Sequence, residues 1–270
     1  MLNSATLLRS VIHLMGVCTI LIFAQYTMAG DKPRIAIIID DLGYHHARGL
    51  RAVYLQAPVS LAILPHAPNS QKLAKAAHSY GKEILLHTPM STTTGKALDA
   101  GALTSAMGQA EFLQVLQQGL AAMPYASGIN NHMGSLLTQQ ADPMHWLMAE
   151  LFQKKLFFVD SRTTANSLAF DIAQDYTLPS IQRDIFLDNQ RQPSAIAKKF
   201  DQLLLLAKKR GWAVAIGHPY PETLALLEQR LPLLTEQGYE VVPVSALLQT
   251  RTHTAMDKRS NSPTNGYINP

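Results

Sequence analysis

The sequence predicts an α/β fold, a distorted (β/α) barrel of roughly seven to eight parallel strands in a single domain. Short apolar runs recur along the chain, as expected for parallel strands that are buried on both faces. Segments with helical apolar spacing separate these runs. The first strand-to-helix turn carries Asp40 and Asp41 in place of the glycine-rich phosphate loop of a dinucleotide-binding sheet, which favours the barrel.

The expected strands follow β-branched, aromatic and leucine-rich runs in chain order. Two of the eight expected strands, near residues 127 and 180, contain few apolar residues and are predicted mainly from their position in the strand–helix alternation. The expected strands are Arg34–Ile39, Val59–Leu64, Glu83–Leu86, Ser127–Asn130, Leu156–Val159, Ser180–Arg183, Trp212–Ile216 and Tyr239–Val242.

Helices are expected between these strands. Apolar stripes predict helices over Gln109–Met123 and Pro193–Arg210. Asp142 before Pro143 predicts a capped helix start, and Pro221 with Glu222 opens a segment that ends at Gly238. Three glycines stand just before strands, where a helix C-cap is expected: Gly81, Gly211 and Gly238.

The two ends of the chain differ from this pattern. Residues 1–29 resemble a signal peptide, with Arg9 before an apolar core and a small-residue cleavage site near Ala29. We therefore expect a periplasmic or secreted protein with no stable membrane span after cleavage; the alternative is an uncleaved anchor. Residues 250–270 are polar and predict a disordered tail, which leaves 33–249 as the barrel.

Composition excludes several classes of protein. With 47% hydrophobic and 16% charged residues among 270, the chain is too apolar to be disordered. Its 23 basic and 19 acidic residues give too small an excess to predict nucleic-acid binding. Cys18 is the single cysteine, so neither an intramolecular disulfide nor a cysteine-based zinc cluster can form.

Polar residues gather at the carboxyl ends of the expected strands. In an α/β barrel these ends converge on one rim, where the chemistry of such folds is found. We therefore expect one site at this rim. The residues at these ends are Asp40, Asp41, His66, His87, Asn131, His132, Asp160, Asp184 and His218.

Several of these residues permit two interpretations. Two adjacent carboxylates repel each other unless a cation neutralises one, and carboxylate with imidazole suits Zn²⁺, Mn²⁺, Fe²⁺ or Co²⁺. Alternatively, Asp41 caps the next helix. His132 is either a third ligand or part of a tight loop, and Asp160 either orients a catalytic group or pairs with Arg162. His218 is either a general acid/base or a loop histidine held by neighbouring prolines.

Six motifs, taken together and in order, resemble the divergent polysaccharide deacetylase family. Each motif contains one or two of the polar residues at the strand ends, together with their flanking residues. The motifs are Ile39-Asp40-Asp41-Leu42-Gly43, Leu64-Pro65-His66-Ala67-Pro68, His87-Thr88-Pro89-Met90, Gly128-Ile129-Asn130-Asn131-His132-Met133-Gly134-Ser135, Val159-Asp160-Ser161-Arg162-Thr163 and Gly217-His218-Pro219.

This resemblance implies a metal-dependent hydrolase that removes acetyl groups from a cell-envelope glycan such as peptidoglycan. It implies that Asp40 is the base and Asp41 a metal ligand. Ordinary members supply two histidines from one segment, but Pro89–Lys96 contains none. The resemblance therefore implies that His132 joins Asp41 and His87 as the third ligand. The Arg-x-Pro-Tyr segment of ordinary members has no clear counterpart.

The sequence hypothesis assigns a role to each remaining residue of the site. The metal is expected to be zinc, although Mn, Fe, Co or Ni also suits the ligands. Asp40 and His218 are the expected base and acid, oriented by Asp160, while Asn131, His66 and Arg162 contact substrate. The alternative is a catalytically altered barrel that binds a glycan or a partner without turnover. The oligomeric state stays open.

Overall fold

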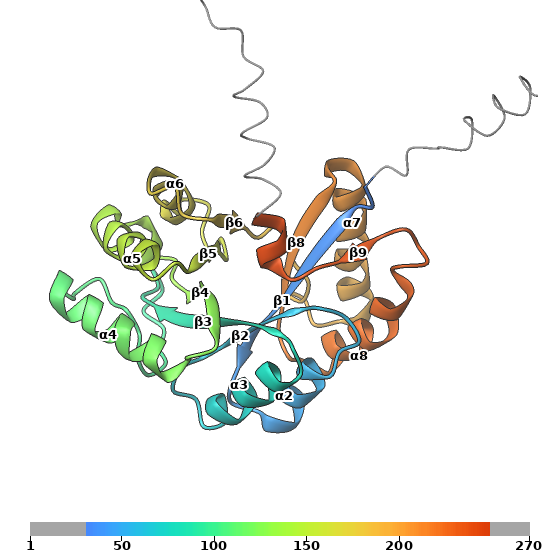
Figure 1. The fold of residues 1–270 in the computed structure, drawn as a ribbon, viewed down its shortest axis with the longest axis horizontal. Helices are drawn as coiled ribbons and strands as arrows, with labels where there is room; N and C mark the ends of the chain where they lie inside the picture. The colour runs from blue at the N-terminus through green and yellow to red at the C-terminus, as the bar shows by residue number, and fades with distance from the viewer. Residues whose placement is uncertain (1–30, 249–270) are drawn as a thin grey trace, which may run out of the picture. The chain divides into compact units, whose positions relative to one another are not determined.

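A computed structural model of the protein describes residues 31–248. Its strands form one sheet of parallel pairs in the order β6-β5-β4-β3-β2-β1-β8-β7, with β9 beside β1 (Figure 1). The strands are β1 (Arg34–Leu42), β2 (Ser60–Ile63), β3 (Glu83–Met90), β4 (Ala126–Met133), β5 (Phe157–Asp160), β6 (Ser180–Gln182), β7 (Ile185–Phe186), β8 (Trp212–Gly217) and β9 (Glu240–Val241).

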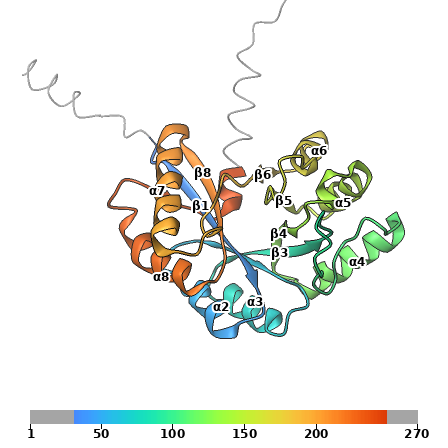
Figure 2. The ribbon, with the colours of Figure 1, turned by 180° about the vertical axis from the view of Figure 1, so that it is seen from behind.

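Helices follow the strands and lie around the outside of the curved sheet, as both ribbon views show (Figures 1 and 2). The longest, α7, ends at Gly211, whose φ of 88° is the left-handed conformation that glycine adopts without strain. The helices are α2 (His46–Val53), α3 (Ser70–Ser79), α4 (Gln109–Ala122), α5 (Ala141–Gln153), α6 (Ala169–Asp175), α7 (Pro193–Arg210) and α8 (Pro221–Arg230), with short 3₁₀ turns at Leu137–Gln139 and Leu231–Leu233.

The barrel is distorted because its sheet does not close. The path ends at β6 and β7, which form no ladder with each other in the described part of the chain. β9 pairs only with Arg34 and Ile35 at the start of β1, and β2 begins its pairing with β1 further along, at Ile38. The predicted distorted parallel barrel is therefore confirmed. The two-residue strand β7 was not predicted.

Side chains alternate across β1 between two apolar cores. Ile35, Ile37 and Ile39 belong to the large core between sheet and helices, whereas Ala36 and Ile38 belong to the core inside the barrel. Because successive strand residues point to opposite faces, Asp40 continues the inner row at the strand end. The same alternation places His87 beyond Leu85 on the inner face of β3.

The chain closes the amino-terminal end of the barrel with its last described residues. Val244, Leu247 and Leu248 pack into the inner core. The backbone N–H of Val244 donates to Ser60 Oγ at 3.0 Å, and Ser60 Oγ donates to Glu83 Oε1 at 2.7 Å. Since both Ser60 and Glu83 begin strands, this plug leaves the carboxyl ends of the strands as the end available for a site.

Two local predictions are wrong. Helix α5 begins at Ala141 after Gln140, so Asp142 lies inside its first turn rather than at the cap. Asp184 lies in the short connection between β6 and β7 rather than at the rim, and its carboxylate pairs with Arg210 at 2.5 Å and accepts the N–H of Val214 at 2.8 Å. Asp184 therefore lies toward the start of β8, away from the rim of strand ends.

The expectations for the chain ends fall outside the described residues. The signal peptide 1–29, including Cys18, and the polar tail 250–270 stay predictions. Within residues 31–248, none of the helices is long and apolar enough to cross a bilayer.

Candidate metal and catalytic site

A bulge at the end of β1 brings both carboxylates of the Asp pair to one site. The register of β1 against β2 shifts between Ile39 and Leu42, and Asp41 has a left-handed φ of 56°. Asp tolerates this conformation better than most residues, and bulges redirect side chains next to functional sites. The alternative role of Asp41 as a helix cap is wrong, because α2 begins five residues later at His46.

Asp41, His87 and His132 present three ligand atoms to a common point. Asp41 Oδ1 lies 3.0 Å from His87 Nε2 and 2.8 Å from His132 Nδ1. The two imidazole nitrogens are 3.1 Å apart. Asp41 and His132 come from the ends of β1 and β4, whereas His87 lies within β3, which continues to Met90 instead of ending before His87 as expected. Both histidine side chains are largely buried.

Asn130 fixes the orientation of the His87 ring. Its Oδ1 lies 2.8 Å from His87 Nδ1, while its Nδ2 donates to Asp40 Oδ1, also at 2.8 Å. An amide oxygen only accepts, so Nδ1 of His87 carries the proton and the lone pair of the neutral ring is on Nε2. Nε2 is the atom that faces Asp41, as a metal-ligating nitrogen must.

The donor set fits a divalent cation. In tetrahedral zinc sites with bonds of 2.0–2.1 Å, ligand atoms lie about 3.3 Å apart. The separations of 2.8–3.1 Å among the three atoms are close to this value. Without a cation, both imidazole nitrogens compete for the same Asp41 oxygen. One carboxylate and two imidazoles, with no thiolate, suit zinc and similar ions.

The two carboxylates of the pair have opposite pKa shifts. Burial raises the pKa of Asp40, despite the opposing charges of His87 and His218 and the hydrogen bond from Asn130. Burial also opposes ionisation of Asp41, but hydrogen bonds from His132 and His87 hold its pKa well below the ordinary value. Such separated pKa values are typical of a pair that divides acid–base and ligand roles.

His218 approaches the cluster from β8. Its Nε2 lies 3.8 Å from Asp41 Oδ2, and its Nδ1 lies 2.8 Å from Asp188 Oδ1. Asp188 Oδ2 accepts the N–H of His218 at 2.6 Å and the hydroxyl of Thr223 at 2.8 Å. Burial alone would lower the pKa of His218, but Asp188, Asp41 and Asp40 raise it to about 9. His218 is therefore held in its protonated form near neutral pH.

The structure does not bring four other predicted residues into this cluster. Asp160 is fully buried and accepts bonds from Arg162 N and Ser167 Oγ, so it organises the turn after β5. The Asn131 amide donates to Met133 O at 2.8 Å and accepts from Ser161 N at 2.9 Å, so both its nitrogen and its oxygen take part in holding the turns after β4 and β5. His66 is exposed and touches Gly101, and Arg162 bonds to Ala165 O at the surface.

Sequence reasoning missed three supporting residues. Asn130 lies in the motif Gly128–Ser135, but its position in the sequence does not reveal that its amide links His87 to Asp40. Asp188 follows the apolar run Ile185–Leu187, a signal of the same kind as those used elsewhere. Asp99, which lies 3.1 Å from His132 Nε2, stands in a segment without strand character, and no local pattern marks it.

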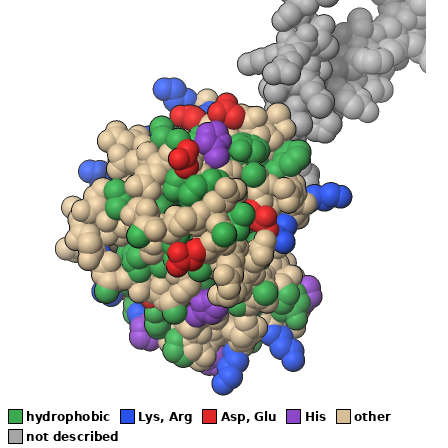
Figure 3. Space-filling view, turned by 90° about the vertical axis from the view of Figure 1, so that its left-hand side faces the viewer, with side chains coloured by type: hydrophobic (Ala, Val, Ile, Leu, Met, Phe, Trp, Pro, Cys, Tyr) green, Lys and Arg blue, Asp and Glu red, His purple; other side chains and the backbone are tan. Residues whose placement is uncertain are grey.

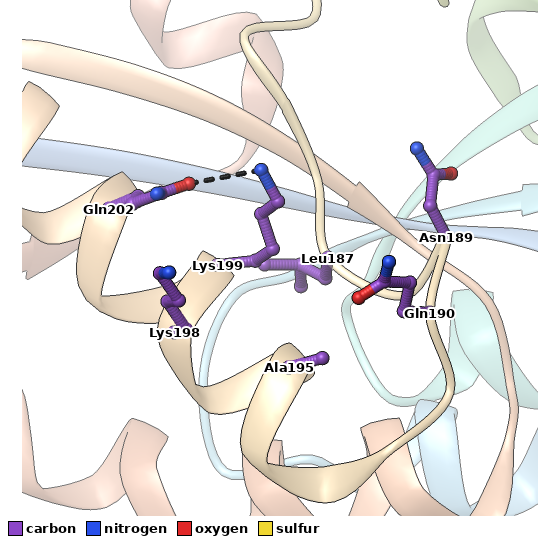
Figure 4. A pocket seen from close by; sticks show the side chains of 7 residues that line it. All are labelled: Leu187, Asn189, Gln190, Ala195, Lys198, Lys199 and Gln202. Carbon is purple, nitrogen blue, oxygen red and sulfur yellow. Dashed lines mark hydrogen bonds between the residues drawn. The ribbon is translucent and has the colours of Figure 1, made fainter.

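Among residues 31–248, the Asp41–His87–His132 group is the one cluster of histidine, cysteine and acidic side chains close enough to hold a metal ion. On the face shown in Figure 3, lysine and arginine side chains are spread around the margin rather than gathered into one patch. A shallow pocket beside α7 is lined by residues such as Leu187, Asn189 and Lys199, with Lys199 bonded to Gln202 (Figure 4). None of the predicted site residues lines that pocket.

The sequence matches one protein-family model, described as divergent polysaccharide deacetylase, over residues 37–248. The chain belongs to the divergent polysaccharide deacetylase family. The match runs from within β1 to the inner plug, so every residue of the Asp41–His87–His132 cluster, together with Asp40 and His218, lies inside the family domain. The resemblance inferred from the sequence motifs is thus confirmed.

Two bacterial proteins are similar to the chain in sequence, and one solved bacterial structure shares its fold. The chain is 33% identical to the uncharacterized protein YibQ of Escherichia coli K12 over 217 residues, 80% of the chain and 67% of YibQ. It is 34% identical to an uncharacterized protein of Haemophilus influenzae over 230 residues, 85% of the chain and 81% of that protein. The crystal structure of uncharacterized protein ATU2773 from Agrobacterium tumefaciens C58 aligns with a TM-score of 0.77 at 24% identity, covering 81% of the chain and 90% of that structure.

More distant structures share the fold of this divergent deacetylase family member. The Bc1960 peptidoglycan N-acetylglucosamine deacetylase aligns with a TM-score of 0.54 at 11% identity, over 81% of the chain and 89% of that structure. A CE4 family pseudoenzyme mutated to restore activity aligns with a TM-score of 0.51 at 14% identity, over 81% of the chain and 68% of that structure. These likenesses support the distorted barrel.

Proposed function

We propose that the protein is a metal-dependent hydrolase that removes acetyl groups from an amino sugar of a cell-envelope glycan. The observation that carries this proposal is the triangle of Asp41, His87 and His132 with Asp40 and His218 beside it. The fold likeness to a peptidoglycan N-acetylglucosamine deacetylase supports the choice of glycan. A signal-peptide-like segment at residues 1–29 supports the periplasm as the place of action.

The three ligand residues would hold the cation at the rim of the barrel. Asp41 Oδ1, His87 Nε2 and His132 Nδ1 are the donor atoms, and Asn130 keeps His87 in the ligating tautomer. When bound, a divalent ion such as zinc polarises the acetyl carbonyl and lowers the pKa of water to about 7.

Asp40 is placed to accept a proton from the attacking water. Asn130 holds its Oδ1, which leaves Oδ2, 3.7 Å from His87 Nε2, facing the ligand triangle. Its buried position raises its pKa, which makes the carboxylate a stronger base than one in water. As Asp40 takes this proton, the water oxygen attacks the acetyl carbonyl carbon; the new C–O bond forms, the C=O π electron pair moves onto the carbonyl oxygen, and the C–N bond stays intact.

His218 is placed to donate a proton to the leaving amine. Its Nδ1 is committed to Asp188, so the Nε2 proton is the one directed toward the site. With a pKa of about 9, the ring carries that proton at neutral pH. Transfer to nitrogen breaks the C–N bond and yields free amine and acetic acid, which keeps the second hydrogen of the water. Asp40 holds the first water proton and His218 is left neutral.

Acetate release tests this proposal directly. Purified protein loaded with zinc, manganese or cobalt is incubated with N-acetylated chitooligosaccharides and with peptidoglycan fragments. We expect release in the wild type and a loss of about 10²–10⁴-fold in Asp40→Asn and in His218→Ala, the usual size of a general acid–base contribution. Glycan binding without acetate release under every metal would refute hydrolysis and favour the alternative, a barrel that binds glycan without turnover.

A further inference from the structure

The segment between β3 and α4 covers one of the metal-ligating histidines. Leu103 N donates to Pro89 O at 2.8 Å, which ties the segment to β3, and Ser91 N donates to Leu103 O at 3.1 Å, which joins the start of the segment to its later part. Leu136 N donates to Ser91 O at 3.0 Å, which ties it to the turn after β4. The segment is therefore held beside His132, which comes from β4.

Asp99 of this segment faces the side of His132 that points away from the ligand triangle. Its Oδ2 lies 3.1 Å from His132 Nε2. That nitrogen is buried and makes no hydrogen bond in the structure, and Asp99 Oδ2 is within ion-pair distance of it. The other oxygen of Asp99 accepts the hydroxyl of Tyr44, from the turn that follows β1, and this bond restrains the carboxylate.

We infer that Asp99 is a positioning residue that holds His132 in its ligating tautomer, an inference that rests on the proposed cation site. A neutral imidazole has one N–H and one lone pair. A proton on Nε2, directed at Asp99, leaves the lone pair on Nδ1, which faces Asp41 Oδ1 at 2.8 Å. Asn130 does the same for His87 from the opposite side of the triangle.

Asp99 thus supplies the contact that orients the His132 ring, which no other residue of the site provides. His87 is fixed by an amide inside the barrel, but His132 is 12% exposed at the rim. A carboxylate on the outer nitrogen also makes the imidazole a more basic ligand. His66, whose ring would lie 2.5 Å from a Cβ at Gly101, packs against the same segment and supports it two residues beyond Asp99.

Zinc affinity measured against a chromophoric chelator tests the inference. We expect Asp99→Ala to weaken zinc binding by about 10–100-fold, the usual effect of losing such a partner. Asp99→Asn keeps an acceptor oxygen and should lose less, and Tyr44→Phe less again. Asp175→Asn, which removes the same charge from an exposed position at the end of α6, is the matched control and should bind like the wild type.

The other outcomes separate this inference from the proposed function. If His132→Ala loses zinc but Asp99→Ala binds like Asp175→Asn, the positioning role is overturned and the metal site stands. If the wild type binds no zinc, both proposals are overturned. In the zinc-loaded protein, ¹H–¹⁵N NMR should show the Nε2 proton of His132 shifted upfield in Asp99→Asn, and an unchanged shift contradicts the inference. Thermal unfolding identifies a misfolded Asp99→Ala, in which case Asp99→Asn decides.

Discussion

Replacing Asp188 with Asn should release the proton that His218 holds. Asp188 Oδ2 accepts two bonds, from His218 N and Thr223 Oγ1, so the amide oxygen of Asn must occupy that position. The NH₂ group of Asn then faces His218 Nδ1, which can no longer carry a proton without placing two donors against each other. The ring becomes neutral, with its proton on Nε2.

The size of the effect follows from the pKa of His218. Burial lowers this pKa, while Asp188 first and Asp41 and Asp40 next raise it, from 6.5 to about 9. A shift of this size corresponds to about 3 kcal/mol of preference for the protonated form in the folded protein. Because the folded-state pKa is raised, this stabilisation is complete below about pH 6.5 and is lost as the pH rises through about 9.

NMR titration of the histidine ring signals in metal-free protein measures the shift. We expect the pKa of His218 to fall by about two units or more in Asp188→Asn. Urea denaturation should show the variant about 2–3 kcal/mol less stable at acid pH, with a smaller difference above about pH 9. Thr223→Val, which removes a donor but keeps the charge of Asp188, is the control. An unchanged His218 pKa in Asp188→Asn would refute the reasoning.

Three further predictions follow from the same contacts. Asn130→Ala leaves the buried Asp40 and His87 Nδ1 without partners, and urea denaturation should show a loss of at least about 2 kcal/mol; a smaller loss means that water replaces the amide. Zinc binding near pH 6 should release about one proton or more, because Asp40 and Asp41 raise the pKa of His87 against the effect of burial. Calorimetry in buffers of different ionisation enthalpy counts the released protons, and a count of zero would contradict this expectation. Arg210→Ala breaks the pair with Asp184 far from the rim, so it should cost at most about 1 kcal/mol and leave zinc affinity unchanged.

The rim could be predicted because each of its main residues ends an apolar run. Asp40 and His132 stand where the buried stretches of β1 and β4 end, and barrel geometry brings such ends together. His87 follows the apolar run Ile84–Leu86 in the sequence, although β3 continues beyond it to Met90. What the runs do not show is the direction of each side chain. Phe157 and Val159 face the inner core, so Asp160 points outward to its own turn. The period of two could have revealed this once the inner face was known.

Other parts of the site depend on contacts between distant segments. Asp99 reaches His132 because backbone bonds from Ser91 and Leu103 fold the segment after β3 back over β4. No periodicity encodes such a path. The predicted position of Asp184 at the rim is wrong for a local reason. The strand expected at Ser180–Arg183 ends at Gln182, and a second short strand begins at Ile185. Short irregular elements are decided by tertiary packing rather than by local propensity.

The charge balance at the rim favours a site that works with a cation over one that only binds glycan. Asp40 is 3% exposed, and a buried carboxylate is costly unless neighbouring groups compensate for it. Here the compensation consists of Asn130, His87 and His218, groups that also orient the ligand triangle and the acid. A glycan-binding surface gains nothing from two adjacent carboxylates whose pKa values are shifted in opposite directions. A hydrolase needs both, because one must stay ionised as a ligand while the other exchanges a proton with water.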